Sequence, residues 1–155
     1  MRRISAQLLI GVALTAIGMF GADVSAGTWK YSIGKSTTTS ANPVKNQTDL
    51  REVSSDGGVK ITRSGEWMDG KKIDYSMTFA YDGKAYPVTG APFDTITANR
   101  VDEHTTSFDV KKTGGTYHVT GRTVVSKDGK VLTQTSKGTD AEGKPVSSRI
   151  VFDKQ

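Results

Sequence analysis

The segment Lys71–Tyr81, KKIDYSMTFAY, decides the fold class of this sequence. Its bulky side chains occupy every second position, and small or polar residues lie between them. A period of two over nine residues predicts a β-strand with one buried face, whereas a helix would scatter the same side chains around its circumference. The side chains of the buried face are Ile73, Tyr75, Met77, Phe79 and Tyr81.

Turn signals divide the rest of the chain into similar short runs. An acidic residue precedes glycine five times, and Asp-Gly pairs favour tight two-residue hairpin turns because glycine adopts positive φ freely and aspartate tolerates it. The runs between the turns are rich in Thr, Val, Tyr, Phe and Ile, which favour strands. The acidic turn residues are Asp56, Asp69, Asp82, Asp128 and Glu142. The expected strands are residues 28–33, 45–54, 59–68, 71–81, 84–89, 94–101, 105–112, 115–126, 130–138 and 145–153.

These strands predict an all-β fold, an antiparallel up-and-down meander of about eight to ten strands. An open meander would expose two unpaired edges, and closure into a barrel removes them. No segment after residue 26 has the periodicity of a helix.

The first residues have the features of a secretory signal. Arg2 and Arg3 precede an apolar run of 13 residues at 8–20, shorter than the roughly 20 residues that span a bilayer. Val24-Ser25-Ala26 then offers small side chains at the positions that a signal peptidase reads. We therefore expect a signal helix and peptide at 1–26, cleavage between Ala26 and Gly27, and a single mature domain at 27–155. A membrane anchor or a buried helix is the alternative for the apolar run.

Such a signal predicts an exported protein, in the periplasm of a Gram-negative bacterium or secreted. The sequence has no cysteine, which excludes a lipid-anchored export signal and disulfide bonds. Residues 27–155 carry 19 basic and 15 acidic side chains, a net charge of +4. The lysines lie singly or in pairs, so no nucleic-acid partner is expected. No second apolar run follows, so we expect no stable membrane insertion after cleavage, and a monomer.

The start of the predicted domain, Gly27-Thr28-Trp29, resembles the Gly-x-Trp motif that opens the first strand of the calycin superfamily, which includes lipocalins and fatty-acid-binding proteins. The overall layout also resembles small exported bacterial β-barrel proteins. The resemblance implies a barrel with the indole of Trp29 plugging one end. It also implies that an arginine of the last strand, here Arg149, lies across that indole as a cation over an aromatic face. Fatty-acid-binding proteins place two helices after the first strand, and the twelve polar residues 33–44 do not fit such a pair.

A barrel of this size either fills its interior with side chains or holds one small ligand. We predict a small hydrophobic or amphipathic ligand, held by an aromatic inner face and by strand arginines that could meet a carboxylate. The alternative is a structural or interaction module of the cell envelope with a filled core. The expected ligand-binding residues are Tyr75, Met77, Phe79, Tyr81, Tyr117, Arg122 and Arg149.

Candidate catalytic motifs are weak. Ser32 and Lys35 match Ser-x-x-Lys, and residues 112–114 match Lys-Thr-Gly, as in penicillin-recognising serine enzymes. The Ser-Asp-Asn element of those enzymes is missing, and their Ser-x-x-Lys opens a helix. His104 and His118 have no second histidine or cysteine at metal-ligand spacing. We therefore expect no catalysis, no catalytic residue, no cofactor and no metal. A small outer-membrane barrel and a barrel-based isomerase or cyclase are the further alternatives.

Overall fold

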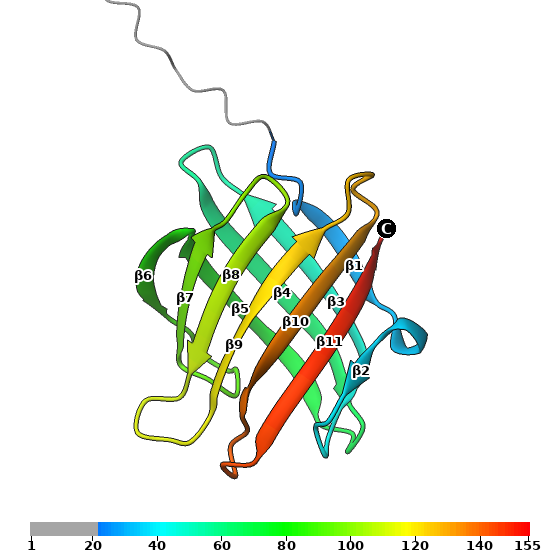
Figure 1. Ribbon diagram of the computed structural model, residues 1–155, viewed down its shortest axis with the longest axis vertical. Coiled ribbons are helices and arrows are strands. Elements are labelled where there is room, and N and C mark those ends of the chain that lie inside the picture. The colour runs from blue at the N-terminus through cyan, green and yellow to red at the C-terminus, as the bar shows by residue number, and fades with distance from the viewer. Residues whose placement is uncertain (1–21) are drawn as a thin grey trace, which may run out of the picture.

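In the computed structural model, which describes residues 22–155, the chain forms one antiparallel eleven-stranded sheet that curls into a nearly closed barrel (Figure 1). The strand order is β5-β4-β3-β1-β11-β10-β9-β8-β7-β6, with β2 paired to β11. The predicted all-β meander is confirmed, whereas the predicted signal helix lies outside the described residues. The strands are β1 Gly27–Tyr31, β2 Thr37–Thr38, β3 Val44–Val53, β4 Gly58–Trp67, β5 Lys72–Ala80, β6 Asp82–Pro87, β7 Thr95–Arg100, β8 Thr105–Lys111, β9 His118–Val125, β10 Val131–Thr139 and β11 Pro145–Lys154.

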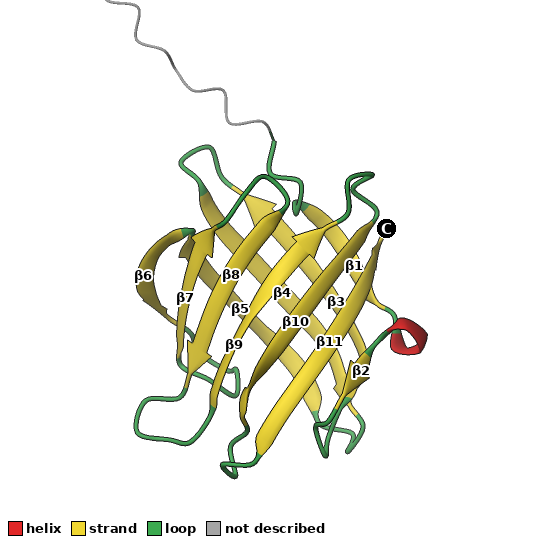
Figure 2. Cartoon of the chain, in the orientation of Figure 1, coloured by secondary structure: helices red, strands yellow, loops and turns green. Residues whose placement is uncertain are grey.

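The first strand of the barrel is interrupted. β1 pairs with the end of β11, where Tyr31 lies opposite Phe152, and the chain then turns outward through the 3₁₀ helix η1, Ile33–Lys35. β2 resumes the pairing further along β11, with Thr37 opposite Arg149. Figure 2 shows η1 as the single red turn on the outside of the barrel. The link between β1 and β3 therefore holds a short turn and a short strand, in agreement with the expectation that no pair of helices fits there.

Four of the five expected turns, at Asp56, Asp69, Asp128 and Glu142, connect strands as predicted, whereas Asp82-Gly83 lies inside β6. The expected turn type was wrong. In the β3–β4 turn, Gly57 N donates to Ser54 O at 3.0 Å, and Ser54 N donates to Gly58 O at 2.9 Å. Gly57 has a φ of 84°, and no residue other than glycine has a positive φ in the described part of the chain. This is a three-residue loop, a type I turn followed by a left-handed glycine, rather than a two-residue turn. Aspartate keeps a negative φ because its carboxylate has another role: Asp56 Oδ1 accepts from Gly58 N at 3.0 Å.

Side chains, rather than a backbone ladder, close the barrel. β5 and β6 end the strand order and are not hydrogen-bonded to each other. The loop after β6 brings Phe93 against Tyr75 of β5, with ring centroids 6.2 Å apart, and against Tyr117, at 6.1 Å. The aromatic rings therefore cover one end of the seam between the two edge strands.

Two hydrophobic clusters form the core and leave space between them. The smaller cluster, here called the Trp29 cluster, lies at the end of the barrel where β1 begins and consists of Trp29, Val125, Leu132 and Phe152. The larger cluster lies mainly on β4, β5, β7 and β8 and includes Ile61, Met77, Phe79, Ile96 and Val110.

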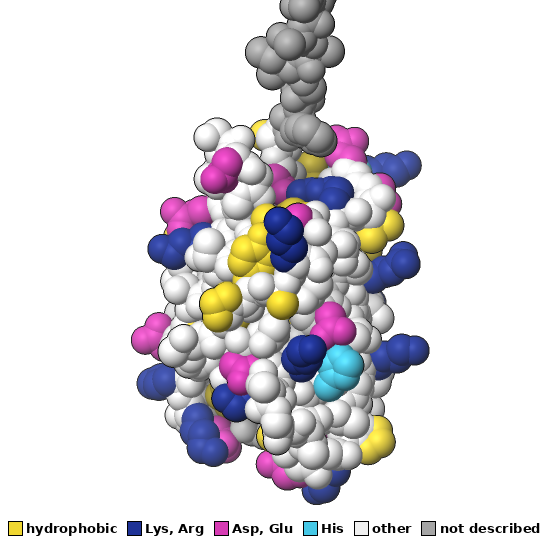
Figure 3. All heavy atoms as spheres, turned by 90° about the vertical axis from the view of Figure 1, so that its left-hand side faces the viewer, with side chains coloured by type: hydrophobic (Ala, Val, Ile, Leu, Met, Phe, Trp, Pro, Cys, Tyr) yellow, Lys and Arg dark blue, Asp and Glu magenta, His cyan; other side chains and the backbone are white. Residues whose placement is uncertain are grey.

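The outer face of the barrel around β6 carries many charged side chains (Figure 3). Figure 3, which looks onto the β6 side, shows acidic and basic side chains intermixed around a small group of hydrophobic ones. Within residues 22–155, no helix has the length and hydropathy needed to cross a membrane.

Candidate functional site: a cavity inside the barrel

A cavity of about 260 Å³ occupies the barrel between the two hydrophobic clusters. Phe152 of the Trp29 cluster lines its inner end, so the cavity stops short of the buried indole. At the other end the lining includes Pro43, Trp67, Pro92 and Asp140, which lie in or beside the turns of that end. Pro92 is exposed, so the cavity meets the surface there. Most of the remaining lining is apolar: Ile61, Met77, Phe79, Ile96, Ala98, Phe108, Val110, Val119, Ile150 and Phe152.

One wall of the cavity is polar because β3 turns a row of polar side chains inward. Gln47, Asp49 and Arg51 alternate along the strand and are 7%, 0% and 3% exposed, whereas Leu50 between them points outward and is 40% exposed. The register fixes this phase, since Asp49 lies opposite Trp29 of β1 on one side and opposite Arg63 of β4 on the other.

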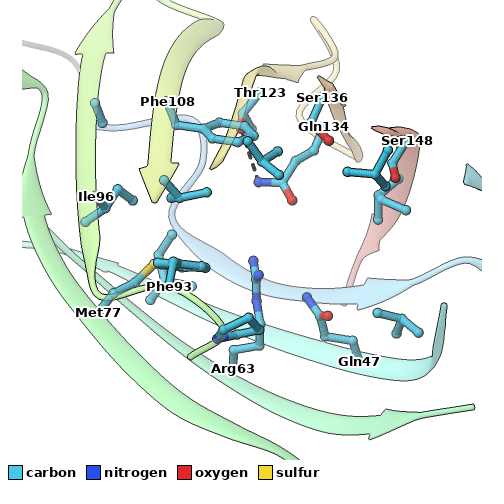
Figure 4. A pocket seen from close by; sticks show the side chains of 18 of the residues that line it. Gln47, Arg63, Met77, Phe93, Ile96, Phe108, Thr123, Gln134, Ser136 and Ser148 are labelled. Atoms are coloured by element: carbon cyan, nitrogen blue, oxygen red, sulfur yellow. Dashed lines mark hydrogen bonds between the residues drawn. The ribbon is translucent and has the colours of Figure 1, made fainter. Parts of the chain in front are cut away.

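Asp49 and Arg63 form a bidentate ion pair inside the barrel. Arg63 Nε donates to Asp49 Oδ1 at 2.9 Å, and Arg63 Nη2 donates to Oδ2 at 2.7 Å. Gln47 Nε2 also donates to Asp49 Oδ1 at 2.8 Å, and Arg63 Nη1 donates to the Tyr75 hydroxyl at 3.1 Å. Figure 4 shows Arg63 and Gln47 side by side on this wall. Each nitrogen of the Arg63 guanidinium and each oxygen of the Asp49 carboxylate therefore has a hydrogen-bond partner.

Electrostatics hold this pair in its charged form. Burial opposes ionisation of Asp49, but Arg63, Arg51 and Gln47 together outweigh burial and lower the pKa of the carboxyl. Burial would likewise lower the pKa of Arg63, and the Asp49 carboxylate outweighs it and raises that pKa. The bond between the two is consequently an ion pair across the ordinary pH range.

Arg51 is the group of the cavity that lacks partners. Its Nη2 lies 3.8 Å from Asp49 Oδ2, which is an ionic contact but too long for a hydrogen bond. No atom of residues 22–155 accepts a hydrogen bond from its Nε or its Nη2. Burial lowers the pKa of Arg51, and the nearby Asp49 and Tyr81 oppose that effect. An arginine keeps its proton in proteins, so two guanidinium groups and one carboxylate leave one positive charge uncompensated.

The opposite wall contributes neutral polar groups. Gln134 Nε2 donates to Thr123 Oγ1 at 3.2 Å, as the dashed line in Figure 4 shows. Burial raises the pKa of Tyr117 to about 12, so its phenol is neutral at physiological pH. Among the described residues, no three His, Asp or Glu side chains converge as metal ligands.

The structure brings four of the expected ligand-binding residues into the cavity. Met77, Phe79, Tyr81 and Tyr117 all line it. Tyr75 faces the same side of its strand but lies behind Arg63, to which it is hydrogen-bonded. Their contact with a ligand stays a prediction.

The two arginines expected at the site point away from it, which corrects the sequence-based placement. Arg149 is exposed, and its Nη1 donates to Lys35 O at 3.0 Å on the outside of the barrel. Arg122 is also exposed and lies beside Ser107 and Thr135 of the neighbouring strands. The reason is the two-residue period: in β11 the even-numbered residues face inward, and in β9 the odd-numbered ones do, so both arginines face solvent.

The closed end of the barrel has a different cation from the one expected. Trp29 is wholly buried within its cluster. Lys154 Nζ, not Arg149, lies over the indole, 5.2 Å from the ring centroid. The lysine holds this position because Trp29 is directly opposite Lys154 in the β1–β11 pairing.

Comparison with solved structures identifies the fold, whereas comparison of sequences finds no relative. No family model matches the sequence, and no curated protein matches it. Among solved structures, the fluorescent protein UnaG is similar with a TM-score of 0.58 and 12% identity over 84% of this chain and 97% of that one. The Schistosoma mansoni fatty acid binding protein in complex with arachidonic acid has a TM-score of 0.56 and 11% identity over 86% and 99% of the two chains.

A third similar structure is the zebrafish ileal bile acid-binding protein complexed with cholic acid. Its TM-score is 0.50, with 12% identity over 85% of this chain and 99% of that one. These likenesses establish the fold alone: the chain is a calycin-like antiparallel β-barrel.

Proposed function

We propose that this protein is an exported carrier that binds one small amphipathic molecule, an apolar body with a single negative charge, inside the barrel and does not transform it. The observation that carries the proposal is Arg51, a buried guanidinium in the cavity with two donor atoms unpartnered. A buried polar group without a partner costs free energy, and a charged one costs more. An anionic group bound there would supply the missing acceptor.

The charge count favours a monoanion. Asp49 neutralises Arg63 through two short bonds, so the cluster of Arg51, Asp49 and Arg63 keeps one excess positive charge. One carboxylate or sulfonate balances it and can accept from two guanidinium donors at once. The apolar walls above Arg51 would then surround the hydrocarbon part of the ligand, which extends toward Trp67 and Pro92 at the open end.

Two of the similar barrels support the ligand class. The Schistosoma mansoni protein was solved with arachidonic acid and the zebrafish protein with cholic acid. Each ligand is an acid with a large apolar body. The cavity also disfavours the alternative of a structural module with a filled core, because an unoccupied apolar space weakens packing with no compensating contact.

Binding can be measured by displacement of a fluorescent lipid probe. We expect straight-chain carboxylates to displace it better than the alcohols of the same chain length, because only the carboxylate pairs with Arg51. Arg51→Met should weaken carboxylate binding roughly tenfold to a hundredfold and leave alcohol binding nearly unchanged. Arg122→Met is the matched control, since that arginine is exposed on the outside, and it should bind like the wild type.

Arg51→Met also tests whether the incompletely paired charge of Arg51 destabilises the protein when no ligand is bound. Without ligand, Arg51→Met should be at least as stable to urea as the wild type, because it removes an incompletely paired buried charge. A less stable variant with unaltered carboxylate affinity would assign Arg51 a structural role. Failure of every hydrophobic probe to bind the wild type would contradict the carrier function itself.

Export is the second part of the proposal and rests on residues 1–26. Cell fractionation of a Gram-negative host that produces the full chain should place the protein in the periplasm or the medium. Retention in the cytoplasm would contradict it.

A further inference from the structure

The four residues before β1, Asp23–Ala26, are folded against the closed end of the barrel and are here called the closing segment. Ser25 is 5% exposed, and Val24 packs against the Trp29 cluster. Trp29 Nε1 donates to Ser25 O at 2.8 Å in a buried hydrogen bond. The indole, which is 0% exposed, therefore takes its acceptor from the closing segment.

Asp23 ties the start of the closing segment to the far side of the sheet. Its Oδ1 accepts from Ser25 N at 2.8 Å and from Ser25 Oγ at 2.6 Å, and Ala26 N donates to Asp23 O at 3.0 Å, which makes a compact turn. Its Oδ2 pairs with Arg100 Nη2 of β7. Burial opposes ionisation of Asp23, but the hydrogen bonds from Ser25 and Arg100 outweigh burial and lower the pKa of its carboxyl.

Cleavage between Ala26 and Gly27, the position expected from the sequence, would remove all of these contacts. The Trp29 indole N–H would lose its acceptor at a wholly buried site, and Arg100 would lose its carboxylate. The cluster would also lose the apolar contact of Val24. A buried donor left without a partner is among the costly defects of a folded protein.

We propose that the export cut falls before Asp23, so that the closing segment stays in the mature protein as part of the barrel. The sequence offers a second site of the required kind upstream, since Ala16 and Gly18 are small residues at the same two-residue spacing as Val24 and Ala26. Cleavage after Gly18 would leave an apolar stretch of eight residues, 8–15, within the length of a signal core.

The intact mass of the exported protein tests this directly. The full chain is produced with its own leader in a Gram-negative host, purified from the periplasm or medium, and analysed by mass spectrometry and N-terminal sequencing. We expect an N-terminus between Met19 and Asp23. An N-terminus at Gly27 would overturn the proposal, and so would an exported chain that still begins at Met1. The proposal rests on export, and a chain retained in the cytoplasm would instead count against export itself.

A comparison of thermal stability tests whether the closing segment stabilises the barrel, independently of the processing enzyme. Chains that begin at Ala22 and at Gly27 are made without a leader, and their thermal unfolding is compared. We expect the Gly27 chain to melt lower by roughly 5–10 °C, or not to fold. Arg100→Met in the Ala22 chain keeps the test informative in that case, because it removes the Asp23 ion pair and the contact of Arg100 with the Tyr81 ring but leaves Ser25 and Val24 in place. It should lower the melting temperature by a smaller amount. Equal melting temperatures for all three proteins would overturn the proposal.

Discussion

At the scale of single residues, Asp49 determines the charge state of the interior. It is completely buried and is the carboxylate that both inner arginines face. Buried ion pairs of this kind are sensitive to loss of one member, because the remaining charge stays desolvated and unpaired.

Asp49→Asn should destabilise the protein by about 3–5 kcal/mol, since Arg63 and Arg51 would then be buried without a counter-charge. Urea unfolding at neutral pH measures the change. Asp74→Asn is the matched control, because Asp74 is exposed on the outward face of β5, and it should have little effect. Equal losses for the two substitutions would mean that the Asp49–Arg63 pair adds nothing specific.

A ligand gives this variant a second readout. If bound carboxylate compensates the excess charge, a saturating anionic ligand should stabilise Asp49→Asn more than it stabilises the wild type. An alcohol of the same length should stabilise both proteins equally.

The polar row of β3 also shows where reasoning from the sequence failed. Strand 45–54 was expected, but nothing in its sequence indicates that Gln47, Asp49 and Arg51 face inward, because the hydrophobic Leu50 belongs to the opposite face. The inward direction of Arg63 could have been predicted, because Arg63 is at every-second-residue spacing from the buried Val59 and Ile61 of the same strand.

Arg149 could have been placed correctly too. The alternation of Val146, Ser148 and Ile150 turns it outward, and the expectation drawn from family resemblance overrode that pattern. The period of two was the better guide at this position.

At the scale of elements, glycines allow the strands to approach each other where the sheet coils. A Cβ on Gly138 of β10 would lie 2.0 Å from His118 O and 2.8 Å from Val119 Cα of β9. Backbone atoms cannot move aside as a flexible side chain could. The close pairing of β9 and β10 at this position therefore requires a residue without a side chain.

Gly138→Ala should therefore destabilise the barrel by roughly 1–3 kcal/mol, as overpacking does. The control is Gly34→Ala in η1, where no atom lies within 4 Å of the added Cβ. Thermal unfolding of the two variants should differ clearly. A Gly138→Ala protein as stable as the wild type would show that β9 and β10 separate at little cost.

The connections between strands followed from the sequence more fully than the interior did. The positions of the turns at Asp56, Asp69 and Asp128 were readable because glycine marks them directly, whereas the same dipeptide at Asp82 lies inside β6. The turn type was not readable, because it depends on whether the aspartate backbone or its carboxylate satisfies the neighbouring N–H groups, and both solutions use the same dipeptide.

At the scale of the whole molecule, the barrel depends on many ionised carboxylates. Hydrogen bonds from Ser54 and Ser126 hydroxyls and from the backbone N–H groups of Lys71 and Lys84 lower the pKa of aspartate carboxyls below the ordinary value of 3.8. The Arg63 guanidinium does the same for Asp49. The affected residues are Asp56, Asp69 and Asp128 in turns and Asp82 at the start of β6.

Stability should consequently depend on pH in one direction. A carboxyl whose folded pKa is depressed stabilises the folded state above its unfolded pKa, and this contribution is lost as pH falls through the folded value. We expect the urea midpoint to be constant from neutral pH to about pH 5 and to fall steadily at lower pH. A midpoint that stayed level as far as pH 3 would contradict the assignment.

Closure of the barrel is a whole-molecule property that the meander pattern predicted only in outline. The alternating strands indicate that the sheet curls, but they do not indicate that β5 and β6 remain without a shared ladder. Phe93 and Tyr75, which cover one end of that seam, come from a loop and a strand far enough apart in sequence that their contact follows from the tertiary fold alone.

The two indoles of this chain differ in their distance from the cavity: Trp67 lines its open end, whereas Trp29 lies beyond its inner end, in the cluster with Phe152. Trp29 is wholly buried, with the ammonium group of Lys154 over its ring, so its emission should stay constant when the proposed ligand binds. Trp67 lines the open end, so binding of the proposed ligand should change its surroundings from water to hydrocarbon. The emission wavelength of Trp67 should therefore report ligand binding without an attached dye, and the emission of Trp29 should serve as the internal reference.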